Sequence, residues 1–346
     1  MIGLDGMKLQ TQERDFLRKV QPAGVIYFKR NVESPQQLAE LSADLYKELK
    51  NPLIGIDQEG GRVARLGEPF TSFSPNMNLG NYYLKTKKLD LVEKKAQAMA
   101  KELKTIGVNL NFTPVVDIHS NPANPIIGDR AFGTTPEIVG KLAQATIKTY
   151  RKEKVVSCAK HFPGHGDTIK DSHLELPTVD IDKKTLMKRE IVPFQKAIQA
   201  GVPTIMTAHV IYPALDPRHP ATLSKIILRD LLRKKMKFKG VIISDDLEMH
   251  AIAKHQSLAT AAIDAMVAGV DLLLVCKSLE EAGSIYEAML KAYRLKEISH
   301  KEVKLSLARM AKLKKEYIKR AFRAPAAKKF AWPTHKKWAD VLSTYA

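Results

Sequence analysis

Short apolar runs recur along the chain and alternate with longer stretches in which apolar residues return every three or four positions. The short runs are nearly continuous, without alternating polar residues, as expected for parallel strands that are covered by helices on both faces. Eight such runs predict strands at residues 2–5, 24–28, 53–57, 109–117, 155–159, 204–209, 240–246 and 270–276.

The stretches between these runs carry helix-start and helix-stop signals. Ser34 precedes Pro35 and Gln37, which predicts an N-cap, a first-turn proline and a capping box at the start of one helix. Pro193 predicts a kink or a split in a later helix, because proline cannot donate a backbone hydrogen bond inside a helix. Helices are predicted at about 34–49, 89–106, from 137 onward, 182–200, 224–236 and 257–268.

Eight strands that are nearly all followed by helices predict the α/β fold class, as a single (β/α)8 TIM barrel. An open, doubly wound sheet is the alternative, but no glycine-rich phosphate fingerprint follows the early strands. The length of 346 residues, 45% of them hydrophobic, is enough for one such barrel with additions. We divide the chain into a barrel domain, residues 1–320, and a basic C-terminal tail, residues 321–346.

The sequence shows no sign of a membrane or export segment. It contains no run of apolar residues long enough for a transmembrane helix, so no membrane partner is expected. The N-terminus lacks a basic region followed by an apolar one, so no signal peptide is expected. Cys158 and Cys276 lie within apolar runs, which predicts buried free thiols and a reducing compartment. We therefore expect a cytoplasmic protein.

Much of the net charge of +19 lies toward the C-terminus, where residues 301–346 hold thirteen Lys or Arg and three Asp or Glu. Such a segment could bind nucleic acid or another acidic surface, or it could be a solvated helix face. It contains no recognised nucleic-acid motif, so we do not expect a nucleic-acid partner. Both tryptophans, Trp332 and Trp338, lie in the tail, and we expect them to pack it back onto the barrel.

Polar residues lie at or after the ends of five of the predicted strands, on the side that forms the mouth of a barrel. Any one of them could merely cap a helix or pair with a neighbour, but together they indicate a catalytic site. Asp245 and Asp246 are the strongest indication of such a site, because two adjacent carboxylates at the end of an apolar strand point in different directions. One could act as a nucleophile, while a helix-capping role suits Asp246 better. The strand-end residues are Asp57, Arg62, Arg65, Asp117, Arg130, Lys160, His161, His209, Asp245 and Asp246.

Three of the ten histidines fall in the segment from His161 to His173. Asp171 stands two residues before His173 and could orient its ring, which makes His173 a candidate general acid/base. His165 could compete for that role. A metal site made of His161, His165, Asp167 and His173 is an alternative, but the strand ends lack the usual grouping of zinc ligands, so no metal is expected.

Four blocks of the sequence resemble glycoside hydrolase family 3 β-N-acetylglucosaminidases. Residues 160–166, Lys-His-Phe-Pro-Gly-His-Gly, followed by Asp171-Ser172-His173, resemble the signature of that family. Residues 57–65, 128–133 and 244–249 match other blocks of the family in the same order. The resemblance runs from near Met1 to about residue 300 and is closest to the short, single-domain bacterial enzymes of peptidoglycan recycling.

This resemblance implies a retaining, exo-acting hydrolase that needs no metal or organic cofactor. Asp245 would be the nucleophile and His173 the acid/base, supported by Asp171. The implied substrate is a small carbohydrate, a 1,6-anhydro-muropeptide that loses its terminal N-acetylglucosamine. The residues implied in binding that sugar are Asp57, Arg65, Arg130, Lys160 and His161.

Other functions stay open at this point. A histidine acid/base does not repel an anion as a carboxylate would, so the same site could use phosphate as the acceptor and act as a phosphorylase. A β-glucosidase could be built on the same scaffold. A metal-dependent hydrolase and a basic barrel that binds nucleic acid are hypotheses from other classes.

Overall fold

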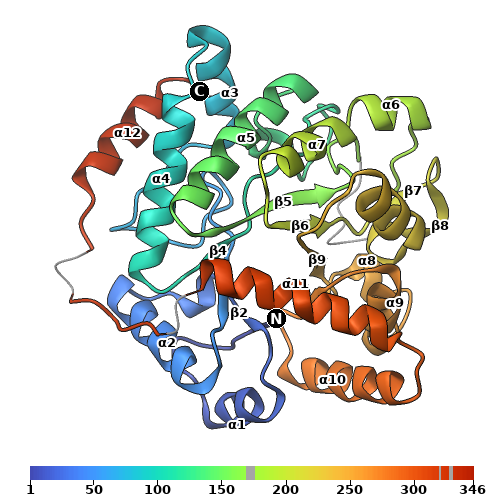
Figure 1. The fold of residues 1–346 in the computed structure, drawn as a ribbon. Coiled ribbons are helices and arrows are strands. Elements are labelled where there is room, and N and C mark those ends of the chain that lie inside the picture. Colours follow the sequence, from blue (N-terminus) through green and yellow to red (C-terminus); the bar gives the residue numbers. More distant parts are fainter. Residues whose placement is uncertain (169–175, 319–320, 327–329) are drawn as a thin grey trace.

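A parallel sheet of eight strands closes on itself at the centre of the protein. The computed structural model describes residues 1–168, 176–318, 321–326 and 330–346 (Figure 1). Neighbouring strands in the sheet follow the order of the chain. The strands are β1 (Ile2–Gly3), β2 (Gly24–Tyr27), β3 (Leu53–Ile56), β4 (Leu110–Asn111), β5 (Val156–Phe162), β6 (Thr204–Thr207), β9 (Val241–Asp246) and β10 (Leu272–Leu274).

The first and last strands meet and complete the barrel. The amide of Gly3 donates to the carbonyl of Val275 at 3.0 Å, and the amide of Val275 donates to the carbonyl of Met1 at 3.1 Å. All eight predicted strands are present, and the predicted (β/α)8 barrel is confirmed. A small antiparallel pair, β7 (Ile211–Tyr212) and β8 (Asp216–Pro220), follows β6.

Helices surround the sheet (Figure 1). The α-helices are α1 (Thr11–Val20), α2 (Pro35–Glu48), α3 (Asn76–Thr86), α4 (Asp90–Thr105), α5 (Pro136–Lys152), α6 (Lys183–Lys188), α7 (Ile191–Gln199), α8 (His250–Ala253), α9 (Leu258–Ala268), α10 (Leu279–Arg294), α11 (His300–Tyr317) and α12 (Pro333–Ser343). The other helical segments are the π-helix η4 (Ile226–Lys235) and the single 3-10 turns η1 (Lys29–Asn31), η2 (Gly128–Arg130) and η3 (Ala221–Leu223).

The local signals in the sequence explain where several helices begin. The hydroxyl of Ser34 accepts the amide of Gln37 at 3.1 Å, so the predicted N-cap of α2 is confirmed. The helix predicted over 182–200 is split, but the break falls between α6 and α7, before Pro193 and not at it. Pro193 therefore lies in the first turn of α7, where a proline leaves no helical hydrogen bond unmade.

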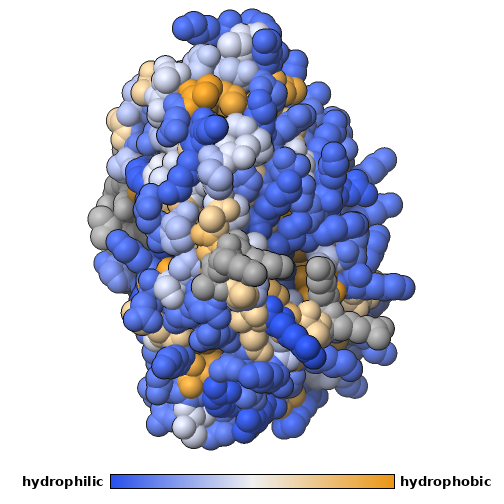
Figure 2. Space-filling view, turned by 90° about the vertical axis from the view of Figure 1, so that its left-hand side faces the viewer, coloured by the Kyte–Doolittle hydropathy of each residue, from blue (hydrophilic) through white to orange (hydrophobic). Residues whose placement is uncertain are grey.

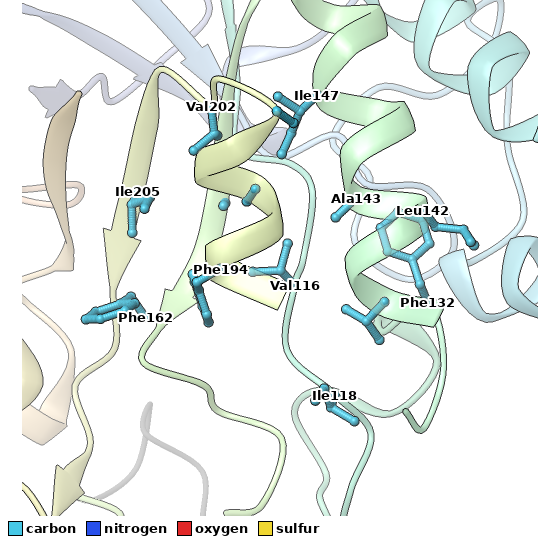
Figure 3. Packing of buried hydrophobic residues seen from close by; sticks show 14 of the residues in the cluster. Val116, Ile118, Phe132, Leu142, Ala143, Ile147, Phe162, Phe194, Val202 and Ile205 are labelled. Carbon is cyan, nitrogen blue, oxygen red and sulfur yellow. The ribbon is translucent and has the colours of Figure 1, made fainter. Parts of the chain in front are cut away.

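Apolar side chains fill the layer between the sheet and the helices. Phe162 of β5 and Phe194 of α7 point toward one another in Figure 3, with ring centroids 5.1 Å apart and planes at 89°. On the other side of β5, Val156 and Cys158 face the inside of the barrel within a separate buried cluster. Because side chains of a strand alternate between faces, Lys160 continues this inward row, and a register shift between Ala159 and Phe162 turns Phe162 to the helix-facing side.

Helix α11 covers the amino-terminal end of the barrel, as its position near the N-terminus in Figure 1 indicates. Its residues Met310, Leu313 and Tyr317 belong to the same buried cluster as Met1 and Leu53 at the starts of strands. The carboxyl end of the barrel is thus the end left for a binding site. Both cysteines are buried and free, as predicted. No helix among the described residues is long and apolar enough to cross a membrane.

The C-terminal segment lies against the barrel. Helix α12 contacts α4 and α3. The Trp332 ring stacks on Phe70 at 5.1 Å, and Trp338 packs against the main hydrophobic core. The expectation that the two tryptophans hold this segment on the barrel is therefore confirmed. The division of the chain at residue 320 stays a prediction.

Candidate active site

A cavity of about 430 Å³ opens at the carboxyl ends of the strands. It is lined by the six predicted site residues that the structure describes, namely Asp57, Arg65, Arg130, Lys160, His161 and Asp245. The other two, Asp171 and His173, lie outside the described residues.

Lys160 is the centre of a buried network of charges. Its ammonium lies 2.7 Å from a carboxylate oxygen of Asp57 and 2.7 Å from one of Glu59. Arg130 donates to both oxygens of Glu59, each at 2.9 Å. Burial alone would raise the pKa of Glu59, but Arg130 and Lys160 hold that pKa well below its usual range. Burial would lower the pKa of Lys160, and here Asp57 and Glu59 outweigh it and raise that pKa. The network is therefore ionised at neutral pH.

Glu59 was not among the predicted site residues, although it is almost completely buried between two of them. The chain turns at Gly60 and Gly61, both with positive φ angles, and this turn returns the loop toward the barrel. A Cβ on Gly60 would lie 2.8 Å from the ammonium of Lys95, so a larger residue would collide there. The sequence did contain a signal: Glu59 lies within the block of residues 57–65 that resembles the family, and buried cations such as Arg130 and Lys160 need carboxylate partners.

Arg65 borders the cavity with part of its hydrogen-bonding capacity unused. One terminal nitrogen lies 3.4 Å from Asp57, and the backbone amide donates to the side chain of Gln58 at 2.8 Å. The guanidinium also lies over the ring of Phe28, 5.8 Å from its centroid. Its Nε is buried and finds no acceptor within the described parts of the chain.

Asp117 fixes the orientation of His161. The carboxylate is fully buried and lies 2.7 Å from Nδ1 of His161, whose backbone amide also donates to it. Burial would raise the pKa of Asp117, but the neighbouring His161 lowers it, so the carboxylate is ionised. An ionised carboxylate places the proton of His161 on Nδ1 and leaves Nε2 for the cavity. The sequence had indicated Asp117 only as a strand-end residue.

The two adjacent carboxylates at the end of β9 have different surroundings. Asp245 accepts the amide of Asp246 at 2.8 Å and has its pKa lowered, because His161, His209 and Lys160 outweigh the effect of burial. Asp246 accepts the amides of Glu248 and Cys276, each at 3.2 Å, and burial raises its pKa to about 6.

Asp245 is thus the ionised group at the cavity, and Asp246 ties β9 to β10. The helix-capping role that suited Asp246 is not observed, because α8 begins after Met249 without a side-chain cap. His209, also predicted as a strand-end residue, reaches the carbonyl of Asp246 with Nε2 at 3.0 Å and thereby supports the end of β9.

Residues 163–168 form a densely bonded turn after β5. The amide of His165 donates to Asp117 at 2.7 Å, and the hydroxyl of Tyr212 donates to the carbonyl of Gly164 at 2.7 Å. The ring of His165 lies 2.9 Å from the hydroxyl of Thr168, and burial lowers the pKa of His165 to about 4. His165 is therefore neutral, and its contacts support the turn.

The alternative metal site includes His173, which lies outside the described residues. Within the described ranges, no group of three or more His, Cys, Asp or Glu side chains could hold a metal ion. The two members that face one another, His161 and His165, meet edge to face with ring centroids 5.8 Å apart.

A buried carboxylate supports this turn from the break between α6 and α7. Glu190 accepts Nε of Arg189 at 2.5 Å, and Arg189 also donates to Asp167 at 2.9 Å. The second carboxylate oxygen of Glu190 is buried without a hydrogen-bond partner among the described residues, and a Cβ on Gly164 would lie 2.9 Å from it. Burial outweighs the pairing with Arg189 and raises the pKa of Glu190 to about 7.

Glu190→Gln should remove a pH dependence of stability. The ordinary pKa of glutamate is 4.5 and the folded value is about 7, so the folded state keeps a proton that the unfolded state releases between these values. The free energy of unfolding of the native protein should therefore fall as pH rises through this window, by ~3 kcal/mol at most. Urea unfolding at pH 5, 6, 7 and 8 measures the slope, which Glu190→Gln should flatten. Glu93→Gln, on an exposed position of α4, is the control and should keep the native slope; an unchanged slope in Glu190→Gln would contradict the prediction.

Residues 2–313 match the sequence family described as glycosyl hydrolase family 3 N terminal domain. The beta-hexosaminidase of Hydrogenovibrio crunogenus is 40% identical over 280 residues, which cover 80% of this chain and 78% of that relative. Beta-hexosaminidase A of Pseudoalteromonas piscicida is 40% identical over 316 residues, covering 84% of this chain but only 53% of that relative, so the chain spans about half of its length.

Solved structures agree with this match over the whole chain. A glycoside hydrolase family 3 beta-N-acetylglucosaminidase from Paenibacillus sp. str. FPU-7 superposes with a TM-score of 0.95 at 36% identity, covering 100% of this chain and 66% of that one. NagZ from Neisseria gonorrhoeae superposes with a TM-score of 0.83 at 29% identity, covering 100% of this chain and 97% of that one.

Proposed function

The chain belongs to glycosyl hydrolase family 3, and on that premise we propose that it is a retaining exo-β-N-acetylglucosaminidase. The observation that carries the proposal is Asp245, a half-buried carboxylate with a lowered pKa that lines a cavity of about 430 Å³ beside the ion pair of Lys160 and Asp57. Such a cavity offers one nucleophilic oxygen and several groups that bind sugar hydroxyls. The names of the relatives, which are beta-hexosaminidases and beta-N-acetylglucosaminidases, support this choice of sugar.

In the proposed reaction, Asp245 attacks the anomeric carbon of the terminal sugar while the bond to the leaving oxygen breaks. His173, supported by Asp171, donates a proton to that oxygen and later takes one from the water that hydrolyses the glycosyl-enzyme. These two roles rest on the sequence motif. Two other carboxylates of the described residues line the same cavity, but Asp57 is paired with Lys160 and Asp246 accepts the backbone amides of Glu248 and Cys276.

The other side chains of the cavity are proposed to bind the terminal N-acetylglucosamine. Asp57 accepts hydrogen bonds from hydroxyls, and Arg65, Arg130 and Lys160 donate them. His161 presents Nε2, because Asp117 occupies its Nδ1. A buried polar site of this kind rejects sugars that lack the matching hydroxyl, since its own groups would then stay unpaired.

We propose a small peptidoglycan fragment, an N-acetylglucosaminyl 1,6-anhydro-muropeptide, as the natural substrate, and the cytoplasm as the site of action. The likeness to NagZ from Neisseria gonorrhoeae, of which this chain covers 97%, supports this proposal. Two buried, free cysteines are compatible with a reducing compartment.

The choice of sugar is tested with the 4-nitrophenyl β-glycosides of N-acetylglucosamine and glucose. We expect kcat/KM to be at least about a hundredfold higher for the N-acetylglucosaminide, because a hydrogen-bonding site discriminates strongly between such analogues. A preference for the glucoside would overturn the sugar assignment. Repeating the reaction in phosphate buffer and in a phosphate-free buffer tests the acceptor: free N-acetylglucosamine supports hydrolysis, and a sugar 1-phosphate as the main product would contradict it.

A further inference from the structure

We propose that the C-terminal segment, residues 330–346, is a clamp that positions the sugar-binding loop between β3 and α3, residues 57–75. The matched family region ends at residue 313, so this segment lies outside it. The clamp is inferred from contacts alone. Only the kinetic part of its test rests on the proposed function.

Aromatic rings of the clamp cover the middle of the loop. Trp332 stacks on Phe70 with centroids 5.1 Å apart and planes at 22°. Phe330 meets Trp332 at 6.2 Å and is itself buried. Phe70 and Phe330 belong to the same hydrophobic cluster as Leu66, which directly follows the proposed binding residue Arg65. The apolar side chains of the loop thus lie in one cluster with those of the clamp.

A buried polar bridge joins the same part of the loop to helix α12. Thr71 of the loop donates to Glu102 of α4 through its amide at 2.9 Å and its hydroxyl at 2.6 Å. His335 of α12 reaches the same carboxylate with Nδ1 at 2.7 Å. All three side chains are buried, so loss of His335 would leave an oxygen of Glu102 with one partner fewer in a low-dielectric site.

The contacts continue from Phe70 and Thr71 to the binding residues. The amide of Gly61 donates to the carbonyl of Phe73 at 2.8 Å, which joins the two arms of the loop. Gln58 accepts the amides of Arg65 and Leu66, at 2.8 and 3.1 Å. A displacement of residues 70–73 would therefore also move the turn beside Glu59 and the backbone of Arg65.

The far end of the clamp is anchored to the helix that follows the loop. Asn81 of α3 donates to the carbonyl of Tyr345 at 3.1 Å, and the rings of Tyr82 and Tyr345 meet at 5.0 Å, edge to face. Leu342 is buried at the same junction. Figure 1 shows α12 along the outside of the barrel beside α4, and the face on that side is mostly hydrophilic in Figure 2, with hydrophobic side chains in separate small spots. Of the large apolar side chains of the clamp, Phe330 and Leu342 are buried against the barrel and Val341 is exposed.

Trp332→Ala tests the clamp in the full-length protein. Hydrogen–deuterium exchange should become roughly tenfold faster for amides of residues 59–73, while amides of β9 keep their native protection. The KM for the 4-nitrophenyl N-acetylglucosaminide should rise roughly tenfold with kcat nearly unchanged, because groups that bind the ground state and the transition state equally act on KM alone.

Three comparisons make the result decisive. Trp332→Phe keeps a ring on Phe70, so its exchange rates and its KM should stay close to the native values. Val341→Ala, at an exposed position of α12, should change neither the exchange rates nor the KM. His335→Ala serves as the second variant if Trp332→Ala does not fold. Unchanged exchange in residues 59–73, equal acceleration there and in β9, or an unchanged KM alongside faster exchange would each overturn the clamp. A failure of the sugar assignment alone would leave the exchange result standing.

Discussion

Asp245→Asn should lower kcat on every glycoside by at least about a thousandfold while the protein stays folded. The asparagine oxygen can still accept the amide of Asp246, which Asp245 binds at 2.8 Å, so the end of β9 should be kept. The amide is not a nucleophile, and no glycosyl-enzyme can form. Initial rates on the 4-nitrophenyl N-acetylglucosaminide measure the loss of kcat, and the melting temperature shows whether the protein stays folded.

His173→Ala is the informative companion to Asp245→Asn. If His173 donates the proton, its loss should slow substrates with poor leaving groups severely but spare the first step with a 2,4-dinitrophenyl leaving group, which needs no proton. Asp245→Asn should be equally slow on both substrate types. A rate in Asp245→Asn that recovers with the better leaving group would contradict the assignment of the nucleophile.

Lys160→Met should be the most destabilising single change at the site. It leaves the buried carboxylate of Glu59 and the half-buried carboxylate of Asp57 with one cation fewer, and breaking a buried pair in this way costs ~3–5 kcal/mol. Glu59 keeps Arg130, so the larger loss falls on Asp57, whose remaining partner Arg65 is 3.4 Å away. Urea unfolding measures the loss, and binding of N-acetylglucosamine should also disappear.

Two variants separate charge burial from the mere loss of a lysine. Lys104→Met removes a partly exposed pair with Glu153, 2.9 Å long, and should cost at most ~1 kcal/mol. The double variant Lys160→Met with Asp57→Asn should regain part of the lost stability without regaining sugar binding. Equal costs for Lys160→Met and Lys104→Met would show that the network around Lys160 is not what stabilises the site.

The sequence predicted that the candidate site residues lie together at the strand ends, but it did not predict their partners. Asp57, Arg65, Arg130, Lys160, His161 and Asp245 all line one cavity, because strand ends in a parallel barrel must meet at one mouth. The pairing of Lys160 with Asp57 joins residues 103 positions apart, and no local pattern marks such a distance. Asp171 and His173 lie outside the described residues, so their roles rest on the motif.

By itself, the sequence determined the barrel, its strand positions and the capped start of α2, because hydrophobic period and capping are local properties of the chain. The tertiary structure alone decided that Glu59 neutralises Arg130 and Lys160, that Asp117 holds His161, and that Asp246 binds backbone amides and does not cap a helix. It also decided which groups hold the C-terminal segment on the barrel, namely Trp332 on Phe70 and His335 on Glu102. Partners of buried charges and rings come from elements far apart in the chain, and only the folded chain brings them within reach of one another.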